Sequence, residues 1–330
     1  MKALFRRSEA VVALVLLLAM IGIGALNPAF FSLSNLFSLA RSNVVNGIMA
    51  LGVLTVMISG GIDVSFPAFA IAAMYLTIRL MLAVQWSGVI GPFLLATAIG
   101  LALGLLNAAL VHGLRMIPLI VTLGTGALVR GALLGLVGTS QINIDRMPPE
   151  LIRFGSTELV AVRDASGAHI GLSAMILIYL ALALLVHLFL GRTLLGRGVY
   201  AYGDDREAAR RAGFSPPWIV FTVYGLAGAL AGFAGLLHAS MIWLANPRDF
   251  IGLELDVIAA VVLGGASIFG GRGSVPGTML GVFLLVMISN SLILMHIPTT
   301  WQRVVVGLIV IAATAITSWR DRRRLARGLA

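Results

Sequence analysis

Long apolar runs alternate with short polar intervals along this chain. A helix needs about 20 mainly apolar residues to cross a bilayer, and these runs recur at that length. Hydropathy, with breaks at glycine, proline and charge, predicts ten spanning helices. They cover residues 10–26, 36–58, 66–84, 89–111, 117–138, 171–190, 218–243, 256–270, 275–295 and 301–318. We therefore expect an all-α fold, a polytopic transmembrane helical bundle formed as one domain by residues 1–330.

Composition agrees with a membrane protein. Hydrophobic residues make up 59% of the chain and charged residues 11%, whereas soluble domains carry about 25% charged residues. The first run continues through Ile23 without a small-residue cleavage site, which predicts a retained helix and not a signal peptide. The net charge of +10 would suit nucleic acid in a soluble protein. In a membrane protein basic residues gather in cytoplasmic loops, so we expect a lipid bilayer and no nucleic acid as partner.

Two intervals, 139–170 and 191–217, stand out by length and polarity. If the N-terminus is cytoplasmic, the inner segments hold 15 of the 23 basic residues and the outer ones hold four. These inner segments are 1–9, 112–116, 191–217, 270–275 and 319–330, and the outer ones are 139–170 and 244–255. The asymmetry predicts that both termini and the loop 191–217 are cytoplasmic and that 139–170 is a periplasmic loop. The two five-span halves then have opposite orientations, as inverted repeats do.

Glycines recur at helical spacing within the apolar runs. Three pairs lie four residues apart: Gly100 with Gly104, Gly131 with Gly135, and Gly228 with Gly232. Small residues at this spacing let helix backbones approach closely in lipid. We expect these glycines to pack helices together.

Signatures of an enzyme are missing from the sequence. Lys2 is the single lysine, so the chain cannot form the glycine-rich phosphate loop whose lysine reaches nucleotide phosphates. The five histidines are scattered without metal-ligand spacing, and there is no cysteine. An intramembrane enzyme would need a cluster of His, Asp or Glu, and none is visible. We expect no metal, no bound cofactor and no catalytic residue in this chain.

Two glycine-rich segments, 59–65 and 263–277, interrupt apolar runs. Broken backbone at membrane depth is tolerated only where protein or a water-filled cavity covers it, and such breaks commonly lie near transport sites. Asp63 and Ser65 follow the first glycine pair. They can cap the next helix through its free N–H groups, or they can line a transport pathway.

Polar residues inside the predicted spans are further candidates. Arg130 lies deep in its span, and a charge at that depth usually faces a cavity or a partner. Asn107 and Thr122 can form hydrogen bonds between helices or contact a solute. Asp256 lies at the edge of the eighth span. The candidate substrate pathway therefore comprises Asp63, Ser65, Asn107, Thr122, Arg130 and Asp256.

The interval 191–217 contains the pattern of a short helix between Asp204 and Gly213. Aspartates stand at its start and arginines toward its end, and a glycine stops it, in agreement with the dipole and cap rules. A solvated basic loop at the membrane surface would need no such punctuation. The pattern favours a docking helix.

Taken together and in order, the motifs resemble the sugar-type permeases of bacterial ATP-binding-cassette importers, which include ribose, xylose, galactofuranose and autoinducer-2 systems. The resemblance covers nearly the whole chain and departs from the family at Val64-Ser65-Phe66-Pro67, where the family usually has Leu-Ser-Val-Gly. The motifs that carry it are Ser59-Gly-Gly-Ile-Asp63-Val-Ser65, Leu119-Ile-Val-Thr-Leu-Gly124-Thr, Glu254-Leu-Asp256-Val-Ile-Ala-Ala-Val-Val-Leu-Gly-Gly265, Gly270-Gly-Arg-Gly273 with Pro276-Gly277-Thr278, and Gly203 to Gly213.

The resemblance implies a permease of the inner membrane that translocates a monosaccharide or similar small polyol by alternating access. It also implies a second permease copy, a cytoplasmic ATPase that uses the ATP, and a periplasmic sugar-binding protein. The residues expected to couple to the ATPase are Arg206, Glu207, Ala208, Ala209 and Gly213. The alternative is an ion-coupled secondary transporter. It predicts acidic residues within the spans, yet only Asp63 and Asp256 come near, both at span edges.

Overall fold

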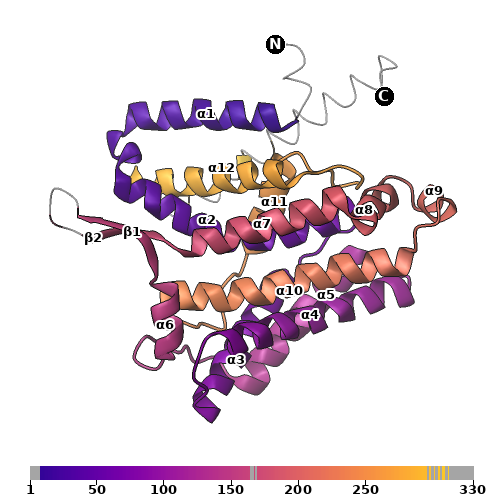
Figure 1. The fold of residues 1–330 in the computed structure, drawn as a ribbon, viewed down its shortest axis with the longest axis horizontal. Coiled ribbons are helices and arrows are strands. Elements are labelled where there is room, and N and C mark those ends of the chain that lie inside the picture. Colours follow the sequence, from indigo (N-terminus) through magenta and orange to yellow (C-terminus); the bar gives the residue numbers. More distant parts are fainter. Residues whose placement is uncertain are drawn as a thin grey trace.

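The computed structural model describes residues 8–163, 167, 169–295 and seven positions between 297 and 311. Most of the long helices lie side by side along the longest axis of the molecule (Figure 1). In chain order the helices are α1 (Ser8–Leu26), η2 (Pro28–Phe31), α2 (Leu33–Ile58), α3 (Phe66–Val84), α4 (Ile90–Gly113), α5 (Pro118–Ala132), η3 (Leu133–Val137), α6 (Pro149–Gly155), α7 (Met175–Arg192), α8 (Leu194–Asp204), α9 (Arg206–Arg211), α10 (Pro216–Ile242), α11 (Leu253–Leu263) and α12 (Val275–Leu294).

A polytopic helical bundle is confirmed. In the described part of the chain, seven helices are long and apolar enough to cross a membrane: α2, α3, α4, α5 with its π-helical continuation η3, α7, α10 and α12. The bounds of α3 coincide with the predicted span 66–84. The first predicted span falls on α1, whose apolar stretch Val12–Leu26 is slightly shorter than the other spans. The tenth, 301–318, lies mostly outside the described residues, so this span stays a prediction.

The eighth predicted span, 256–270, is wrong as a spanning helix. Here α11 has only 11 residues, a length of about 16 Å against the 30 Å of a hydrocarbon core. Gly264 and Gly265 end it, with Gly265 at a left-handed φ of 93°. A Cβ at Gly264 would approach the backbone of Gly277 closer than 3.0 Å. The chain therefore turns back through residues 264–274 and packs α12 directly against α11.

The core of the bundle is formed by α2, α3 and α10, whose apolar windows are mostly buried. α10 packs against α4 through the predicted glycine pairs. A Cβ at Gly228 would lie 2.9 Å from the Cα of Gly104, and one at Gly100 would lie 2.9 Å from the Cα of Gly232. The backbones of the two helices are thus in direct contact, as small residues allow.

The third glycine pair does not pack. Gly131 and Gly135 are exposed, and a Cβ at either position would meet nothing within 4 Å. The prediction of a helix contact at this pair was wrong within the described chain, because the pair lies on the side of α5 and η3 that turns away from the bundle.

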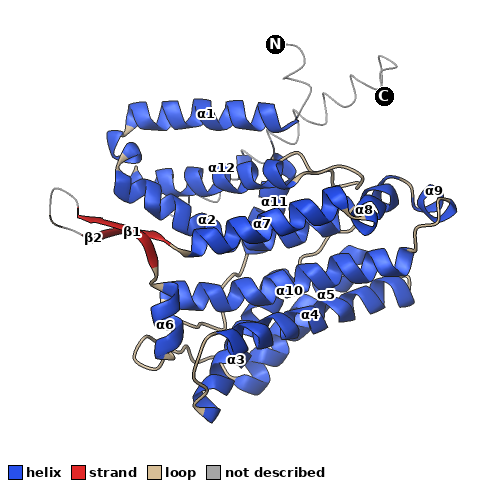
Figure 2. Cartoon of the chain, viewed as in Figure 1, coloured by secondary structure: helices blue, strands red, loops and turns tan. Residues whose placement is uncertain are grey.

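The expectation of an all-α fold needs one correction. Within and just beyond the predicted loop 139–170, the strands β1 (Glu158–Arg163) and β2 (His169–Ser173) form an antiparallel hairpin, preceded by α6 (Figure 2). β-branched residues alternate in β1, as Val160 and Val162, which favours a strand. The surrounding polarity hid this pattern, and β1 is exposed along its whole length.

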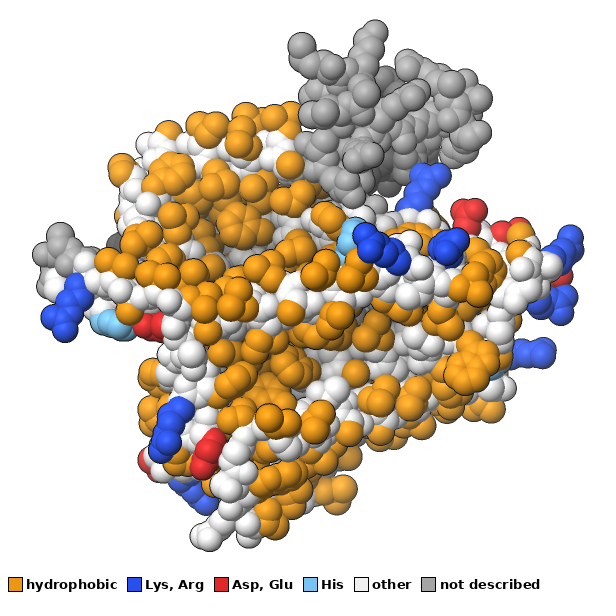
Figure 3. All heavy atoms as spheres, in the orientation of Figure 1, with side chains coloured by type: hydrophobic (Ala, Val, Ile, Leu, Met, Phe, Trp, Pro, Cys, Tyr) orange, Lys and Arg blue, Asp and Glu red, His pale blue; other side chains and the backbone are white. Residues whose placement is uncertain are grey.

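Segments predicted to share a side of the membrane meet at the same end of the bundle. At one end Ile142 pairs with Ala245, which joins the intervals 139–170 and 244–255. At the other end Gly271 N donates to Ile58 O at 2.9 Å, and the Tyr200 hydroxyl donates to Gly273 O at 2.9 Å. Charged side chains gather at the two ends, and hydrophobic ones cover the flank between them (Figure 3). This distribution suits a bundle surrounded by lipid.

Candidate functional site

A buried polar network joins the segment directly before α3 to α4 and α5. Ser65 Oγ donates to Asp63 Oδ1 at 2.6 Å and accepts from Asn107 Nδ2 at 2.8 Å. Thr125 Oγ1 donates to Asn107 Oδ1 at 2.7 Å. Thr122 Oγ1 accepts from Val64 N at 3.3 Å. These polar side chains are all buried, so their hydrogen bonds replace those that water would otherwise make.

The network bears on the two interpretations of Asp63, which both stay predictions. Its Oδ1 also accepts from Ser65 N at 2.8 Å, directly before α3 begins. That is the geometry of an Asx turn before the helix, whereas Ser65, the N-cap residue of α3, makes no side-chain cap bond. Four of the six candidate pathway residues therefore meet, but they hold three helices together and none of them lines a described cavity. The sequence missed Thr125, although its spacing of three from Thr122 places both on one helix face.

A separate open cavity of about 220 Å³ lies between α2, α11 and α12. Asp256 is on its wall, so the structure separates this candidate from the buried network. Four other polar residues line it: Ser42, Asn46, Ser289 and Asn290. Among the described residues, Asn290 Oδ1 is buried without a hydrogen-bond partner. Sequence reasoning missed these four. The signal was polar residues within apolar runs, with Ser42 and Asn46 four apart on one face.

Arg130 lies apart from both groups. It is half-buried near the end of α5, and its Nε has no hydrogen-bond partner among the described residues. Its predicted contact with a cavity or partner stays a prediction.

Three glycine-rich segments meet at one end of the bundle. Gly60 follows α2, Gly203 is in the last turn of α8, and Gly270 and Gly271 lie in the turn before α12. A Cβ at Gly203 would approach Ile58 O and Gly271 N closer than 3.0 Å. Both backbone breaks predicted from the sequence are therefore in contact with α8. We call this contact the glycine junction.

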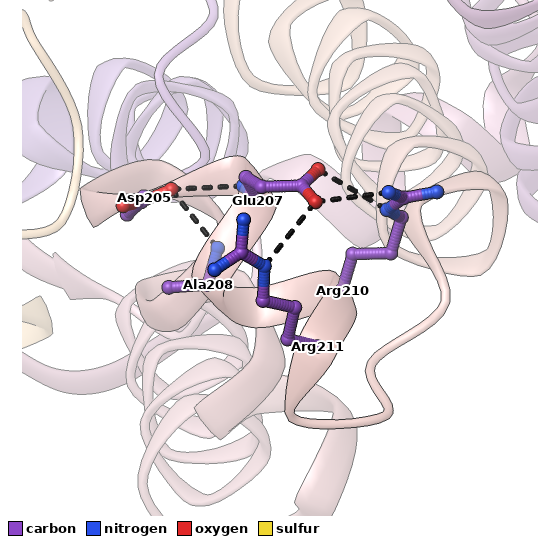
Figure 4. A network of polar contacts seen from close by, with 5 residues as sticks. All are labelled: Asp205, Glu207, Ala208, Arg210 and Arg211. Atoms are coloured by element: carbon purple, nitrogen blue, oxygen red, sulfur yellow. Dashed lines mark hydrogen bonds and ion pairs between the residues drawn. The ribbon is translucent and has the colours of Figure 1, made fainter.

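The short helix predicted between Asp204 and Gly213 is confirmed as α9, at the same end. Asp205 Oδ1 caps it by accepting from Glu207 N at 2.8 Å and Ala208 N at 3.0 Å (Figure 4). These two backbone bonds lower the pKa of Asp205. Because the folded pKa lies below the unfolded one, the cap contributes its stability at neutral pH and loses it as pH falls through the folded value. Gly213 follows at a left-handed φ of 90°.

The candidate coupling residues divide into two kinds. Ala208 is exposed, and Arg206 is exposed with its guanidinium 5.2 Å above the centre of the Tyr202 ring. Ala209 is buried against the bundle, so its predicted place on a docking face was wrong: successive helix residues point about 100° apart.

Glu207 and Arg210 form an ion pair within one helix. Both are on α9, where Glu207 binds Arg210 at 2.9 Å and Arg211 at 3.4 Å (Figure 4). This pairing lowers the pKa of Glu207 and raises that of Arg210. It stabilises the helix itself and leaves the small Ala208 face open.

The interval 191–217 is mainly helical, since α8 occupies its first half and α9 follows.

A comparison of the chain with known protein families gives a match over most of its length. The family model described as "Branched-chain amino acid transport system / permease component" matches residues 35–314. The chain belongs to this permease family.

Curated relatives of the permease are named as import permeases. The autoinducer 2 import system permease protein LsrC of Yersinia pseudotuberculosis is 33% identical over 93% of the permease and 83% of its own length. The ribose import permease protein RbsC of Escherichia coli K12 is 31% identical over 96% of the permease and 94% of its own length. The resemblance drawn from the motifs is confirmed at the level of the family. No solved structure matches the permease.

Two substitutions at Asp63 separate capping from a charge requirement. Asp63→Asn keeps the Oδ1 acceptor and should leave the apparent Tm of the detergent-purified permease nearly unchanged. Asp63→Ala removes two buried hydrogen bonds and should destabilise the fold by about 2 kcal/mol. Thermal unfolding followed by tryptophan fluorescence measures both. An Asn variant that is stable but transports nothing would contradict the capping role and return Asp63 to the pathway.

Proposed function

We propose that this permease is the translocating subunit of an ATP-driven importer for a monosaccharide or similar small polyol. The observation that carries the proposal is α9: an exposed, capped helix beside the glycine junction, in a chain without a phosphate-loop lysine. An ATP-driven transporter subunit of this kind must receive its energy by contact with another protein. The names of the ribose and autoinducer 2 permeases support the class of solute.

The contacts of α8 suggest how that energy reaches the bundle. Only Asp205 separates α8 from α9, and α8 touches the ends of α2 and the turn before α12 through Gly203 and Tyr200. A partner ATPase that moves α9 would therefore shift both backbone breaks through one short helix. Alternating access then follows as a change in population between two arrangements of the bundle.

The cavity between α2, α11 and α12 is the solute pathway that we propose. Its amide, hydroxyl and carboxylate groups suit the hydroxyls of a polyol, which both donate and accept hydrogen bonds. Asp256 belongs to this pathway, whereas Asp63, Ser65, Asn107 and Thr122 support it structurally. The cavity is open to the surface, and a second permease copy, identical or related, would close it.

We infer the orientation in the membrane from the distribution of basic residues and from which loops meet at each end of the bundle. The end with α9 is cytoplasmic, with both termini and the ATPase on that side. The end with the β1–β2 hairpin is periplasmic, where a sugar-binding protein would deliver the solute. The membrane is the bacterial inner membrane, and the two halves of the chain would cross it in opposite orientations.

The rival, an ion-coupled secondary transporter, would use carboxylates inside the spans. Asp63 already accepts two hydrogen bonds from Ser65. Asp256 stands at the exposed start of α11. Neither is placed at mid-membrane on a spanning helix, so the ATP-driven function is the better supported.

Asn290→Leu tests the proposed pathway. The substitution keeps the branched shape of the side chain and removes an amide whose Oδ1 is buried without a partner in the described chain. It should lower solute uptake about tenfold or more, because a hydroxyl of the solute loses its partner. The apparent Tm should stay the same or rise, since no protein hydrogen bond is lost.

The matched control is Ser291→Ala on the same helix. Ser291 Oγ donates to Met287 O of its own helix and does not line the cavity, so uptake should be near normal. Equal uptake in both variants and the wild type would exclude Asn290 from the pathway.

A further inference from the structure

A second pocket, of about 400 Å³, lies under α9 at the end of the bundle that we assign to the cytoplasm. Its walls come from the end of α4 and the segment before α5, from α8 and α9, and from α10. It is separate from the α2–α11–α12 cavity and shares no residue with it. We call it the α9 pocket.

The lining of the α9 pocket carries an excess of positive charge. Arg115, Arg206 and Arg210 contribute three guanidinium groups, and His112 adds an imidazole. Glu207 is the one carboxylate among its lining residues, and it is held by Arg210 and by Arg211 outside the pocket. Arginine is the side chain best suited to bind phosphate, because its planar fork donates two parallel hydrogen bonds.

An unused donor reaches the pocket from its buried side. Tyr224, on α10, is almost fully buried, lines the pocket, and has a hydroxyl without a hydrogen-bond partner in the described structure. A buried hydroxyl without a hydrogen-bond partner destabilises the fold. A bound molecule that accepts a hydrogen bond from Tyr224 would remove this penalty. An anion among three arginines is such an acceptor.

The backbone conformation of Arg115 also points to a bound ligand. Arg115 has a left-handed φ of 53°. This backbone conformation is strained for arginine and unstrained for glycine. Residues held in such conformations cluster at ligand clamps. Arg206 is in turn held by its stacking over Tyr202, another lining residue.

We propose that the α9 pocket binds a phosphate-bearing anion. The phosphate would lie among Arg115, Arg206 and Arg210 and accept a hydrogen bond from the Tyr224 hydroxyl. It would join the α4–α5 connection to α9 and so fix the coupling helix against the bundle. Two sources share this chemistry: a phosphorylated sugar in the cytoplasm and the headgroup of an anionic phospholipid. This site goes beyond the transport function, and its test needs no transport.

The experiment measures binding to the purified, full-length permease in neutral detergent at constant ionic strength. Ribose 5-phosphate, ribose and inorganic phosphate are titrated, and the unfolding temperature is followed by tryptophan fluorescence. In a second arm, native mass spectrometry counts phosphatidylglycerol retained from mixed nanodiscs with phosphatidylcholine. A rise in unfolding temperature with ribose 5-phosphate but not ribose assigns the cytoplasmic source. Retention of phosphatidylglycerol alone assigns the lipid.

Three variants make the result specific. Arg115→Gln and Tyr224→Phe should each weaken the binding seen in the wild type by about tenfold or more. Arg197→Gln removes the same charge from an exposed position of α8 outside the pocket and should bind normally. Without ligand, Tyr224→Phe should unfold at the same temperature as the wild type or higher, which separates lost binding from lost folding. Binding in neither arm, or equal weakening by Arg197→Gln, would overturn the proposal.

Discussion

Gly228→Ala should prevent the permease from packing, although alanine is the best helix former and glycine one of the worst. The added Cβ would lie 2.9 Å from both the Cα and the N of Gly104 and even closer to Gly100 O. All of these are backbone atoms, which cannot turn aside as a flexible side chain can. α4 would have to move away from α10, and the contacts of Gly232 and Gly104 along the same line would open with it. We expect a loss of about 3 kcal/mol or more.

Gly191→Ala is the matched control for this prediction. Gly191 is also helical, but a Cβ there would meet nothing within 4 Å, so alanine should be neutral or slightly stabilising. Yield of monodisperse protein and the apparent Tm in detergent report both variants. A Gly228→Ala permease as stable as Gly191→Ala would show that α4 and α10 are not in backbone contact.

Ala208→Trp should abolish uptake while leaving the permease folded. Ala208 is exposed on α9, and its side chain takes no part in the Asp205 cap or the Glu207 pairs (Figure 4). A bulky ring should therefore leave α9 intact but prevent an ATPase from fitting closely over this face. Co-purification of the ATPase and solute uptake are measured together, and both should be lost.

The neighbouring positions provide the controls. Ala208→Ser keeps a small side chain and should keep the complex and its uptake. Ala209→Trp alters a buried residue and should instead lower the apparent Tm, because the core cannot hold the extra volume. A normal complex and normal uptake with Ala208→Trp would remove α9 from the coupling interface.

Periodicity and local start and stop signals were sufficient to predict the seven long spanning helices of the described chain and α9. Span 66–84 coincides with α3, because Gly60 and Gly61 break the chain before it and apolar residues fill it without interruption. α9 was predictable because its cap and stop signals are local. Local signals failed at α11, where hydropathy continues past the glycine pair that turns the chain. They also failed at the exposed β1–β2 hairpin, whose short apolar stretch is surrounded by polar residues.

The candidate site was predictable only residue by residue. Asn107 and Thr122 were singled out as buried polar groups, but their shared network depends on which helices lie side by side. The cavity depends on α2 meeting α12, which are more than 200 residues apart. Gly203 gave no local signal, because its role is a contact with Ile58 and Gly271. Pairing of distant segments is set by the packing of the whole bundle, which no short pattern contains.

Reconstituted uptake tests the central claim most directly. The permease is placed in proteoliposomes with its ATPase on the face of α9, and the binding protein is supplied at the opposite face with a radiolabelled monosaccharide. The account predicts accumulation only when the ATPase, the binding protein and ATP are all present, unchanged when proton and sodium gradients are collapsed. Accumulation by the permease alone, driven by either ion gradient, would contradict it.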